Sequence, residues 1–353
     1  MKRTFTTTLV GAAAMLALAV TACKKEENKG PGAAGGAGGG AGPVPAQTGF
    51  AVFPASSKMI FGVSLTSARS SALWGMYKDQ VEAAMTKEFA EFKTNCGFDP
   101  FSQLQTVVVG GDPDAKELVI VAKGIQREQI KTCGEKMASQ KGKKFVVTDE
   151  GNLAQYEVDN EKVWGAWLDA STIVLSPEKD KAYVTQRAAG QAGLGDSAEV
   201  MGLLKNVDTS ATLYLVSTAD AWANSGQAGE MIKGTMKGAK GIFASIKLTD
   251  GLSLDAGVRF DTAENAKTFT ATAQSQLDMA KGQQMPPQLA GLTQAIEKAK
   301  VSQNGNDTII QLQLTNEQLK QLASFFMQMS QAFGGMAGAA GGAPGGDTAK
   351  PAQ

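Results

Sequence analysis

Two stretches of low complexity limit what this chain can fold into. Residues 24–48 and 334–353 consist mainly of Gly, Ala and Pro. Such stretches bury too little apolar surface to offset the conformational entropy that ordering removes. We therefore expect a folded body from Gly49 to Phe333, which is long enough for one large domain or two ordinary ones.

The N-terminus has the three parts of an export signal. Lys2 and Arg3 form the charged region, an apolar run extends from Leu9 to Val20, and small residues precede Cys23. The apolar run is shorter than the roughly 20 residues that a membrane-spanning helix needs. We expect residues 1–22 to be a signal peptide that is removed.

The stretch Val20-Thr21-Ala22-Cys23 resembles the lipobox of bacterial lipoproteins, although the family more often has Leu where Val20 stands. The resemblance covers only the first 23 residues. It implies that Cys23 is acylated and that the signal is cut just before it. In that family an Asp after the cysteine favours the inner membrane, so Lys24 implies the outer membrane. A secreted protein without lipid is the alternative, because small-residue cleavage sites also occur without lipidation.

Acylation of Cys23 makes membrane lipid the first expected partner. Each buried methylene contributes about 0.8 kcal/mol, so several acyl chains give lasting attachment. Residues 23–48 then form the lipidated cysteine and a disordered tether. A Gly-rich coil of this length holds the folded body roughly 25 to 30 Å from the bilayer. Residues 334–353 are expected to be a disordered tail.

Charge and histidine content exclude several classes of function. The chain has 34 basic and 34 acidic residues, and removal of the signal with Lys2 and Arg3 leaves 32 basic residues and a net charge of −2. Nucleic acid needs a basic field and is not an expected partner. The chain has no histidine, which removes imidazole bases, Ser-His and Cys-His pairs and most transition-metal sites. No cofactor or metal is expected.

Two cysteines remain for the folded body, Cys96 and Cys133. An even number in an oxidising compartment predicts a disulfide. Closing this loop would stabilise the fold by roughly 3 to 4 kcal/mol in the chain-entropy model. Two separate buried thiols are the alternative, and zinc is disfavoured because two cysteines cannot supply four N or S ligands.

Apolar periodicity and turn signals predict strands and helices in an order that occurs twice, in residues 49–190 and 191–333. Each half is expected to have a strand, a long helix, two strands, a helix, antiparallel strands and a closing helix. The first strands are predicted at Met59–Leu65 and Thr212–Ser217. The long helix after the first strand is expected to be capped near Thr66 or Ser67 and to carry Met85, Phe89 and Phe92 on its apolar face. Turns are predicted at Asp159-Asn160, directly after a strand at Leu153–Val158, at Asp250-Gly251 and at Asn304-Gly305-Asn306-Asp307. A final helix is predicted from Thr315 through Leu319, Leu322, Phe325, Phe326 and Met329.

This order predicts an α+β fold of two related halves, each an antiparallel sheet with helices packed on one face. The element order and the corner Gly97-Phe98-Asp99-Pro100 resemble those of uncharacterised duplicated α+β lipoproteins of bacterial envelopes.

Several residues could suggest a site, and each has a simpler structural interpretation. Trp164, Trp167 and Tyr156 could line a pocket, but aromatic residues in strands are usually packing. Asp112 and Asp114 have the spacing of a calcium loop, but the later ligands are missing, which favours a turn.

Two further groups are treated in the same way. The run Lys141-Gly142-Lys143-Lys144 could contact anionic lipid or form a solvated loop. Met327, Met329 and Met336 could bind copper, but methionine commonly fills helix packing.

No combination of residues requires catalysis, so we expect a non-enzymatic envelope lipoprotein whose folded body binds an envelope protein or acts as a structural module. The alternative is a carrier or sensor for an apolar small ligand, which predicts a cavity lined by residues such as Trp164, Phe145 or Tyr214. An enzyme would need a cleft with a strongly perturbed carboxylate or lysine.

Overall fold

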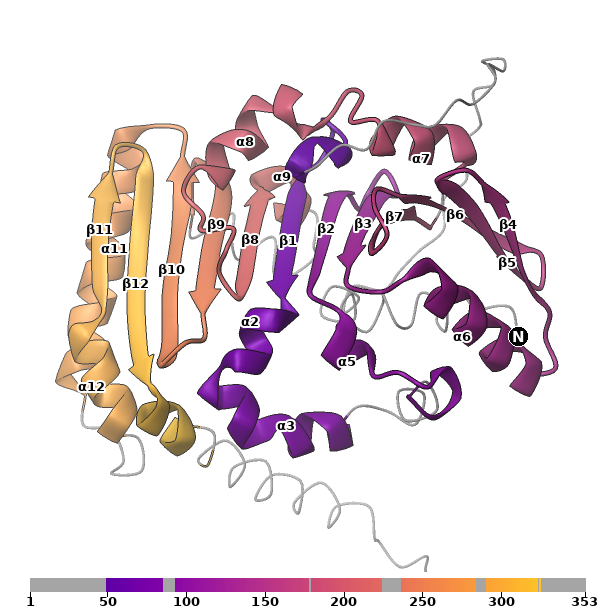
Figure 1. Ribbon diagram of the computed structural model, residues 1–353. Coiled ribbons are helices and arrows are strands. Elements are labelled where there is room, and N and C mark those ends of the chain that lie inside the picture. Colours follow the sequence, from indigo (N-terminus) through magenta and orange to yellow (C-terminus); the bar gives the residue numbers. More distant parts are fainter. Residues whose placement is uncertain are drawn as a thin grey trace, which may run out of the picture.

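The computed structural model describes residues 49–84, 93–177, 179–223, 236–283, 290–322 and 324. Their strands form a single antiparallel sheet of twelve strands in the order β11-β12-β10-β9-β8-β1-β2-β3-β7-β6-β5-β4 (Figure 1). The helices and the sheet together give an α+β fold, as the sequence predicts.

The strands are β1 (Met59–Ser64), β2 (Thr106–Asp112), β3 (Glu117–Lys123), β4 (Phe145–Glu150), β5 (Leu153–Val158), β6 (Glu161–Trp167), β7 (Thr172–Ser176), β8 (Leu213–Thr218), β9 (Ala239–Lys247), β10 (Gly251–Phe260), β11 (Lys300–Asn304) and β12 (Asp307–Thr315). The helices are η1 (Gly49–Val52), α2 (Leu65–Ser70), α3 (Ala72–Ala84), α5 (Pro100–Gln103), α6 (Arg127–Gln140), α7 (Lys181–Ala188), η2 (Leu194–Asp196), α8 (Ala198–Leu204), α9 (Ala219–Ala223), α11 (Ala263–Gly282) and α12 (Ala290–Lys298), where η marks a 3-10 helix. Residues 93–96 and 316–322 are also helical.

The predicted turn residues join neighbouring strands. Asp159 and Asn160 connect β5 to β6 with φ angles of +49° and +71°, and two successive positive φ values are typical of the tight turns that match strand twist. Gly251 begins β10 directly after Asp250, and Gly305 connects β11 to β12 with a φ of +57°. The local turn chemistry therefore fixes these hairpins.

The two sheets expected from the sequence are one continuous sheet. Strand β1 pairs with β2 on one side and with β8 on the other, and Gly62 lies opposite both Val108 and Tyr214. A Cβ atom on Gly62 would lie 2.2 Å from the Tyr214 ring, so glycine is needed for β1 and β8 to pair while the ring covers this position. The expectation of a separate sheet in each half is wrong in this respect.

Helices pack on both faces of the sheet, which corrects the expectation of a single covered face. Ala166 and Trp167 are neighbours on β6, so their side chains point to opposite faces. Ala166 packs in a cluster with Val184 of α7, whereas Trp167 packs in a cluster with Ala138 of α6. Helices α6 and α7 therefore lie on opposite sides of the sheet.

The largest apolar cluster lies on the α7 face. It joins Ile60 and Val216 of the central strands to Val200 and Leu203 of α8. On the α6 face, α11 and α12 pack against β10 and β12. Figure 1 shows α7 and α8 near one end of the strands and α2 and α3 near the opposite end.

The helix after β1 differs from its predicted form. Its N-cap is Ser64, whose hydroxyl accepts the backbone N–H of Ser67, so α2 begins before the predicted cap at Thr66 or Ser67. The chain then leaves helical geometry at Ser71, and α3 begins at Ala72. The Ser71 hydroxyl accepts a hydrogen bond from the backbone N–H of Trp74. A serine hydroxyl that binds the backbone in this way competes with the helical hydrogen bonds, which favours a break between α2 and α3. The later predicted helix positions, Met85 to Phe92, lie outside the described residues.

Candidate functional site

The chain joins the core directly after residues 24–48. Val52 and Phe53 are each 1% exposed and belong to the largest apolar cluster. The Phe50 ring meets the Tyr214 ring edge-on, with centroids 6.3 Å apart. Residues 50–53 therefore form a strap that covers the middle of the sheet, and the sequence reasoning did not identify it.

A tight loop holds the strap in place. Pro54 forms a β-bridge with Gly193, and the N–H of Ala55 donates to the carbonyl of Ala192 at 3.1 Å. The buried Arg187 side chain donates to the carbonyls of Ala192 at 3.1 Å and Gln191 at 2.5 Å. The guanidinium therefore organises the loop that receives the strap.

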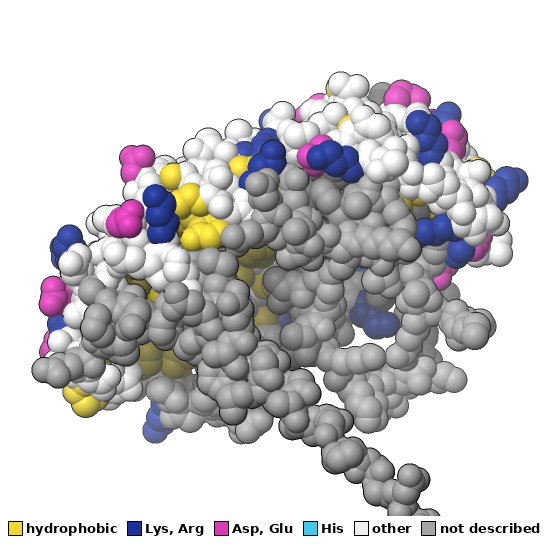
Figure 2. All heavy atoms as spheres, turned by 90° about the horizontal axis from the view of Figure 1, so that it is seen from below, with side chains coloured by type: hydrophobic (Ala, Val, Ile, Leu, Met, Phe, Trp, Pro, Cys, Tyr) yellow, Lys and Arg dark blue, Asp and Glu magenta, His cyan; other side chains and the backbone are white. Residues whose placement is uncertain are grey.

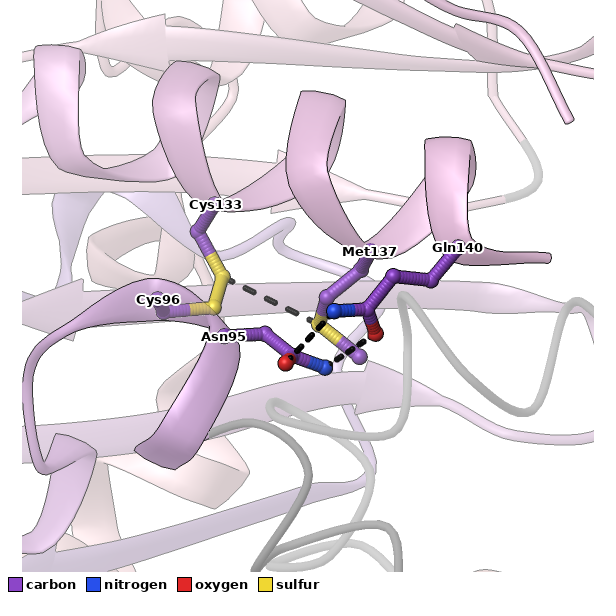
Figure 3. The surroundings of a disulfide bond; sticks show 5 residues. All are labelled: Asn95, Cys96, Cys133, Met137 and Gln140. Carbon is purple, nitrogen blue, oxygen red and sulfur yellow. Dashed lines mark hydrogen bonds between the residues drawn. A yellow bond between two sulfur atoms is a disulfide. The ribbon is translucent and has the colours of Figure 1, made fainter. Parts of the chain in front are cut away.

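The structure places Cys96 and Cys133 as a disulfide pair, with Cα atoms 4.4 Å apart. Cys133 lies on α6, and its sulfur is 3.8 Å from the sulfur of Met137 one turn later. Figure 3 shows that Asn95 and Gln140 lie beside this pair and exchange two amide hydrogen bonds, one of them 2.7 Å long. Residues 95–96 are thus held against one side of α6.

Two of the three aromatic residues singled out in the sequence pack together in the core. The Nε1–H of Trp167 donates to the Tyr156 hydroxyl at 3.0 Å, and both residues are 5% exposed. Burial raises the pKa of Tyr156 to about 12, and the hydrogen bond from Trp167 opposes this shift more weakly. Trp164 lies on the opposite face, where the Lys181 ammonium is 5.6 Å from its ring centroid.

The three side chains expected to line a ligand cavity do not converge. Phe145 packs in the cluster with Tyr156, Tyr214 packs in the cluster with the strap, and Trp164 packs against a third cluster beneath α7. These residues therefore do not line one shared cavity.

Asp112 and Asp114 form the predicted turn. One Asp112 oxygen accepts the N–H groups of Asp114 at 3.0 Å and Ala115 at 3.3 Å, and the other lies 3.0 Å from the Lys58 ammonium. The hydrogen bond to Asp112 raises the pKa of Lys58. Both oxygens of Asp112 thus serve the turn and its link to the start of β1.

A second carboxylate network was not found from the sequence. Asp307 accepts hydrogen bonds of 2.7 Å from both Nε and Nη2 of Arg259 and one of 3.1 Å from the Asn206 side chain. Arg259 and Asp307 are partners in the β10–β12 register, and Asn206 follows α8. The pairing of β10 with β12 brings Arg259 and Asp307 together. Residues this far apart in the chain leave no local sequence signal of their contact.

The remaining groups singled out in the sequence lie in different places. In the Lys141–Lys144 loop, the Lys143 ammonium lies 2.7 Å from the Asp159 carboxylate. The methionines proposed as copper ligands, Met327, Met329 and Met336, lie outside the described residues, as does Cys23. Among the described residues no group of three or more Cys, Asp or Glu is arranged to hold a metal ion.

Charges of both signs are mixed on the described surface. Figure 2 shows Lys and Arg side chains interspersed with Asp and Glu side chains on the side that it presents. Within the described parts of the chain, no helix is both long enough and apolar enough to cross a membrane.

Comparisons with known proteins give a structural similarity alone. No protein-family model and no curated protein matches the chain. Among solved structures, TP0453 in crystal form III has a TM-score of 0.46 at 9% identity, and the match covers 78% of this chain and 96% of that chain. TP0453 in crystal form IV has a TM-score of 0.45 at 8% identity with the same coverage.

Proposed function

We propose that this chain is a lipid-anchored protein of the bacterial cell envelope that acts by binding an envelope partner rather than by catalysis. Cys23 carries the acyl groups, residues 24–48 form the tether, and the outer membrane is the location that Lys24 implies. The folded body then stays within reach of the bilayer.

The observation that carries this proposal is the sequence Val20-Thr21-Ala22-Cys23 directly after an export signal. The strap is compatible with it, because it joins the segment that follows Cys23 to the core. Val52 and Phe53 become fully buried only a few residues after the Gly-rich segment ends. Burying two such side chains contributes about 3 to 6 kcal/mol, so the anchored end is attached to the centre of the sheet rather than to a frayed terminus.

The buried carboxylates support a binding or structural role. Asp112 is engaged by Lys58 and two backbone N–H groups, and Asp307 is engaged by Arg259 and Asn206. Carboxylates whose oxygens are engaged in this way stabilise turns and strand registers.

We also propose that the two halves arose by duplication. Strands β1, β2, β3, β7 and β6 are neighbours in that order, and β8, β9, β10, β12 and β11 repeat it. A helix follows the first strand of each set, and helices separate the third strand from the later ones. The antiparallel pairing of β1 with β8 is consistent with a two-fold relation between the halves.

Fractionation of cells tests the anchor and the export signal together. The wild-type chain should remain with the membranes after a high-salt wash, and a Cys23→Ser variant should move to the soluble envelope fraction. A matched Cys96→Ser, Cys133→Ser variant should stay with the membranes. Firm membrane retention of Cys23→Ser would refute the lipid anchor.

A further inference from the structure

The twelve-stranded sheet ends at β4 on one side and at β11 on the other (Figure 1). Strand β4 pairs with β5 along its whole length, and its other edge forms no backbone hydrogen bond with any described residue. Such an edge is a row of N–H and C=O groups that can pair with another strand. The outer edge of β4 is therefore a candidate interaction surface.

The two edge strands differ in their protection against such pairing. Proteins commonly block an exposed strand edge with lysine or proline. Strand β11 begins with Lys300 and is exposed at every residue except Val301. Strand β4 instead contains the β-branched run Val146-Val147-Thr148 and has neither lysine nor proline. This composition is typical of a strand that accepts a neighbour.

Opposite charges lie at the two ends of β4. Lys144 directly precedes the strand and is exposed, and Glu150 is its last residue. Lys144 has no carboxylate partner among the described residues, whereas the neighbouring Lys143 is held by Asp159 at 2.7 Å. Glu150 contacts the Lys181 ammonium through one oxygen, which leaves its carboxylate able to accept a second ammonium group. A copy of β4 that runs in the opposite direction would pair these charges.

Hydrogen-bonding geometry limits how two such edges can pair. Alternate residues of an edge strand direct their N–H and C=O groups outward, so two copies related by a two-fold axis pair with one residue opposite itself. With Val147 on the axis, Lys144 lies opposite Glu150 at both ends of the ladder. Moving the axis to Val146 or Thr148 takes both charged pairs out of register. The charge pattern thus selects one antiparallel arrangement.

The side chains on both faces of β4 suit this arrangement. Val147 is half-buried in the cluster of Phe145 and Ala138 on the α6 face. On the axis it would contact its own copy, so the apolar cluster would continue from one subunit into the next. Val146 and Thr148 lie on the other face, where these two β-branched side chains would be cross-strand neighbours.

We propose that β4 pairs with β4 of a second copy of this chain, antiparallel and centred on Val147, so that the sheet continues across a two-fold axis. Lys144 of each subunit then lies opposite Glu150 of the other. Pairing through the sheet edge does not require acylation of Cys23 and therefore does not depend on the proposed lipid anchor.

Analytical ultracentrifugation of the full chain carrying Cys23→Ser, which removes the expected acylation site, tests this pairing. The chain should show a monomer–dimer equilibrium. Lys144→Glu and Glu150→Lys each place two pairs of like charges across the interface and should weaken dimerisation at least about tenfold. An equimolar mixture of the two variants should restore dimerisation, because both pairs in the mixed dimer are again of opposite charge.

Lys300→Glu on β11 is the matched control and should leave dimerisation unchanged. Equilibrium unfolding of each variant checks that the charge reversals leave the monomer folded. A chain that stays monomeric at about 0.1 mM would overturn the proposal. So would a mixture that dimerises no better than the single variants, or a dimer that Lys300→Glu weakens and Lys144→Glu does not.

A cross-link tests the register. Val147→Cys in the Cys23→Ser chain places the new thiol on the axis and should give a disulfide-linked dimer under mild oxidation, because directly opposite residues on neighbouring strands are close enough for a disulfide. Ser302→Cys on β11 should give no such dimer. Equal cross-linking of both variants, or of neither, would contradict the arrangement.

Discussion

Two tyrosine hydroxyls are kept neutral by the core. Burial raises the pKa of both Tyr156 and Tyr214 from the ordinary tyrosine value of 10.0 to about 12. The Tyr156 hydroxyl accepts a hydrogen bond from Trp167, whereas Tyr214 packs against the Phe50 ring of the strap. The two residues therefore share a pKa shift but differ in what their hydroxyl groups do for stability.

The pKa shifts predict how stability changes in alkali. A pKa raised in the folded state means that the unfolded chain releases its proton first, so stability is complete below pH 10 and falls as the pH rises towards 12. Tyr214→Phe should remove part of this loss, up to about 2 kcal/mol, with little effect at neutral pH. Tyr156→Phe should cost about 1 to 2 kcal/mol at neutral pH, because the Trp167 N–H loses its acceptor.

Chemical unfolding at a series of pH values, followed together with tyrosinate absorbance, measures both effects. If Tyr156 and Tyr214 ionise near pH 10 in the folded protein, the burial described for them is wrong.

At the scale of elements, the junction between β1 and β8 depends on Gly62. A methyl group there would overlap the Tyr214 ring, so Gly62→Ala should destabilise the fold by about 1 to 3 kcal/mol. Tyr214→Ala alone should cost about 3 to 5 kcal/mol because it leaves a cavity. The double variant should cost less than the sum, because the new methyl group occupies vacated space.

Gly75→Ala is the matched control for this prediction. Gly75 lies within α3 with no atom within 4 Å of its added Cβ, and alanine is the better helix former by about 1 kcal/mol. This substitution should be neutral or stabilising in equilibrium unfolding. If the losses in free energy of unfolding from Gly62→Ala and Tyr214→Ala were strictly additive in the double variant, the Tyr214 ring would not lie over Gly62.

Most individual strands could be predicted from the sequence because their signals are local. The run Leu153–Val158 ends at Asp159-Asn160, and the structure has β5 and a turn at these residues. The seven-residue helix α8 was missed because it is short, contains Gly202 and follows a Gly-rich loop. The break at Ser71 was missed because an apolar pattern does not reveal which serine hydroxyl will bind the backbone.

At the scale of the whole molecule, the pairing of strands that are distant along the chain could not be predicted from the sequence. Two separate sheets and one continuous sheet have the same strand order along the chain, and the choice depends on whether Gly62 meets Tyr214 across the centre. The Arg259–Asp307 pair likewise follows from strand register. By contrast, Cys96 and Cys133 could be proposed as disulfide partners, because they are the two cysteines that remain after Cys23 and an exported protein is expected in an oxidising compartment.

The disulfide is expected to stabilise the whole fold. Cys96 and Cys133 are 37 residues apart, and opening a loop of this size should lower the free energy of unfolding by about 3 to 4 kcal/mol in the chain-entropy model. Reduction, Cys133→Ser and the Cys96→Ser, Cys133→Ser double variant should all lower the denaturation midpoint similarly. Two free thiols in the non-reduced protein, with no effect of reductant on the midpoint, would refute the bond.

The most direct test of the lipid anchor is the intact mass of the protein purified from the membranes of its native host. We expect a chain that begins at Cys23 and carries the added mass of several fatty acyl groups on that residue. A chain that still begins at Met1, or one cut near Ala22 without any lipid, would contradict the lipid anchor.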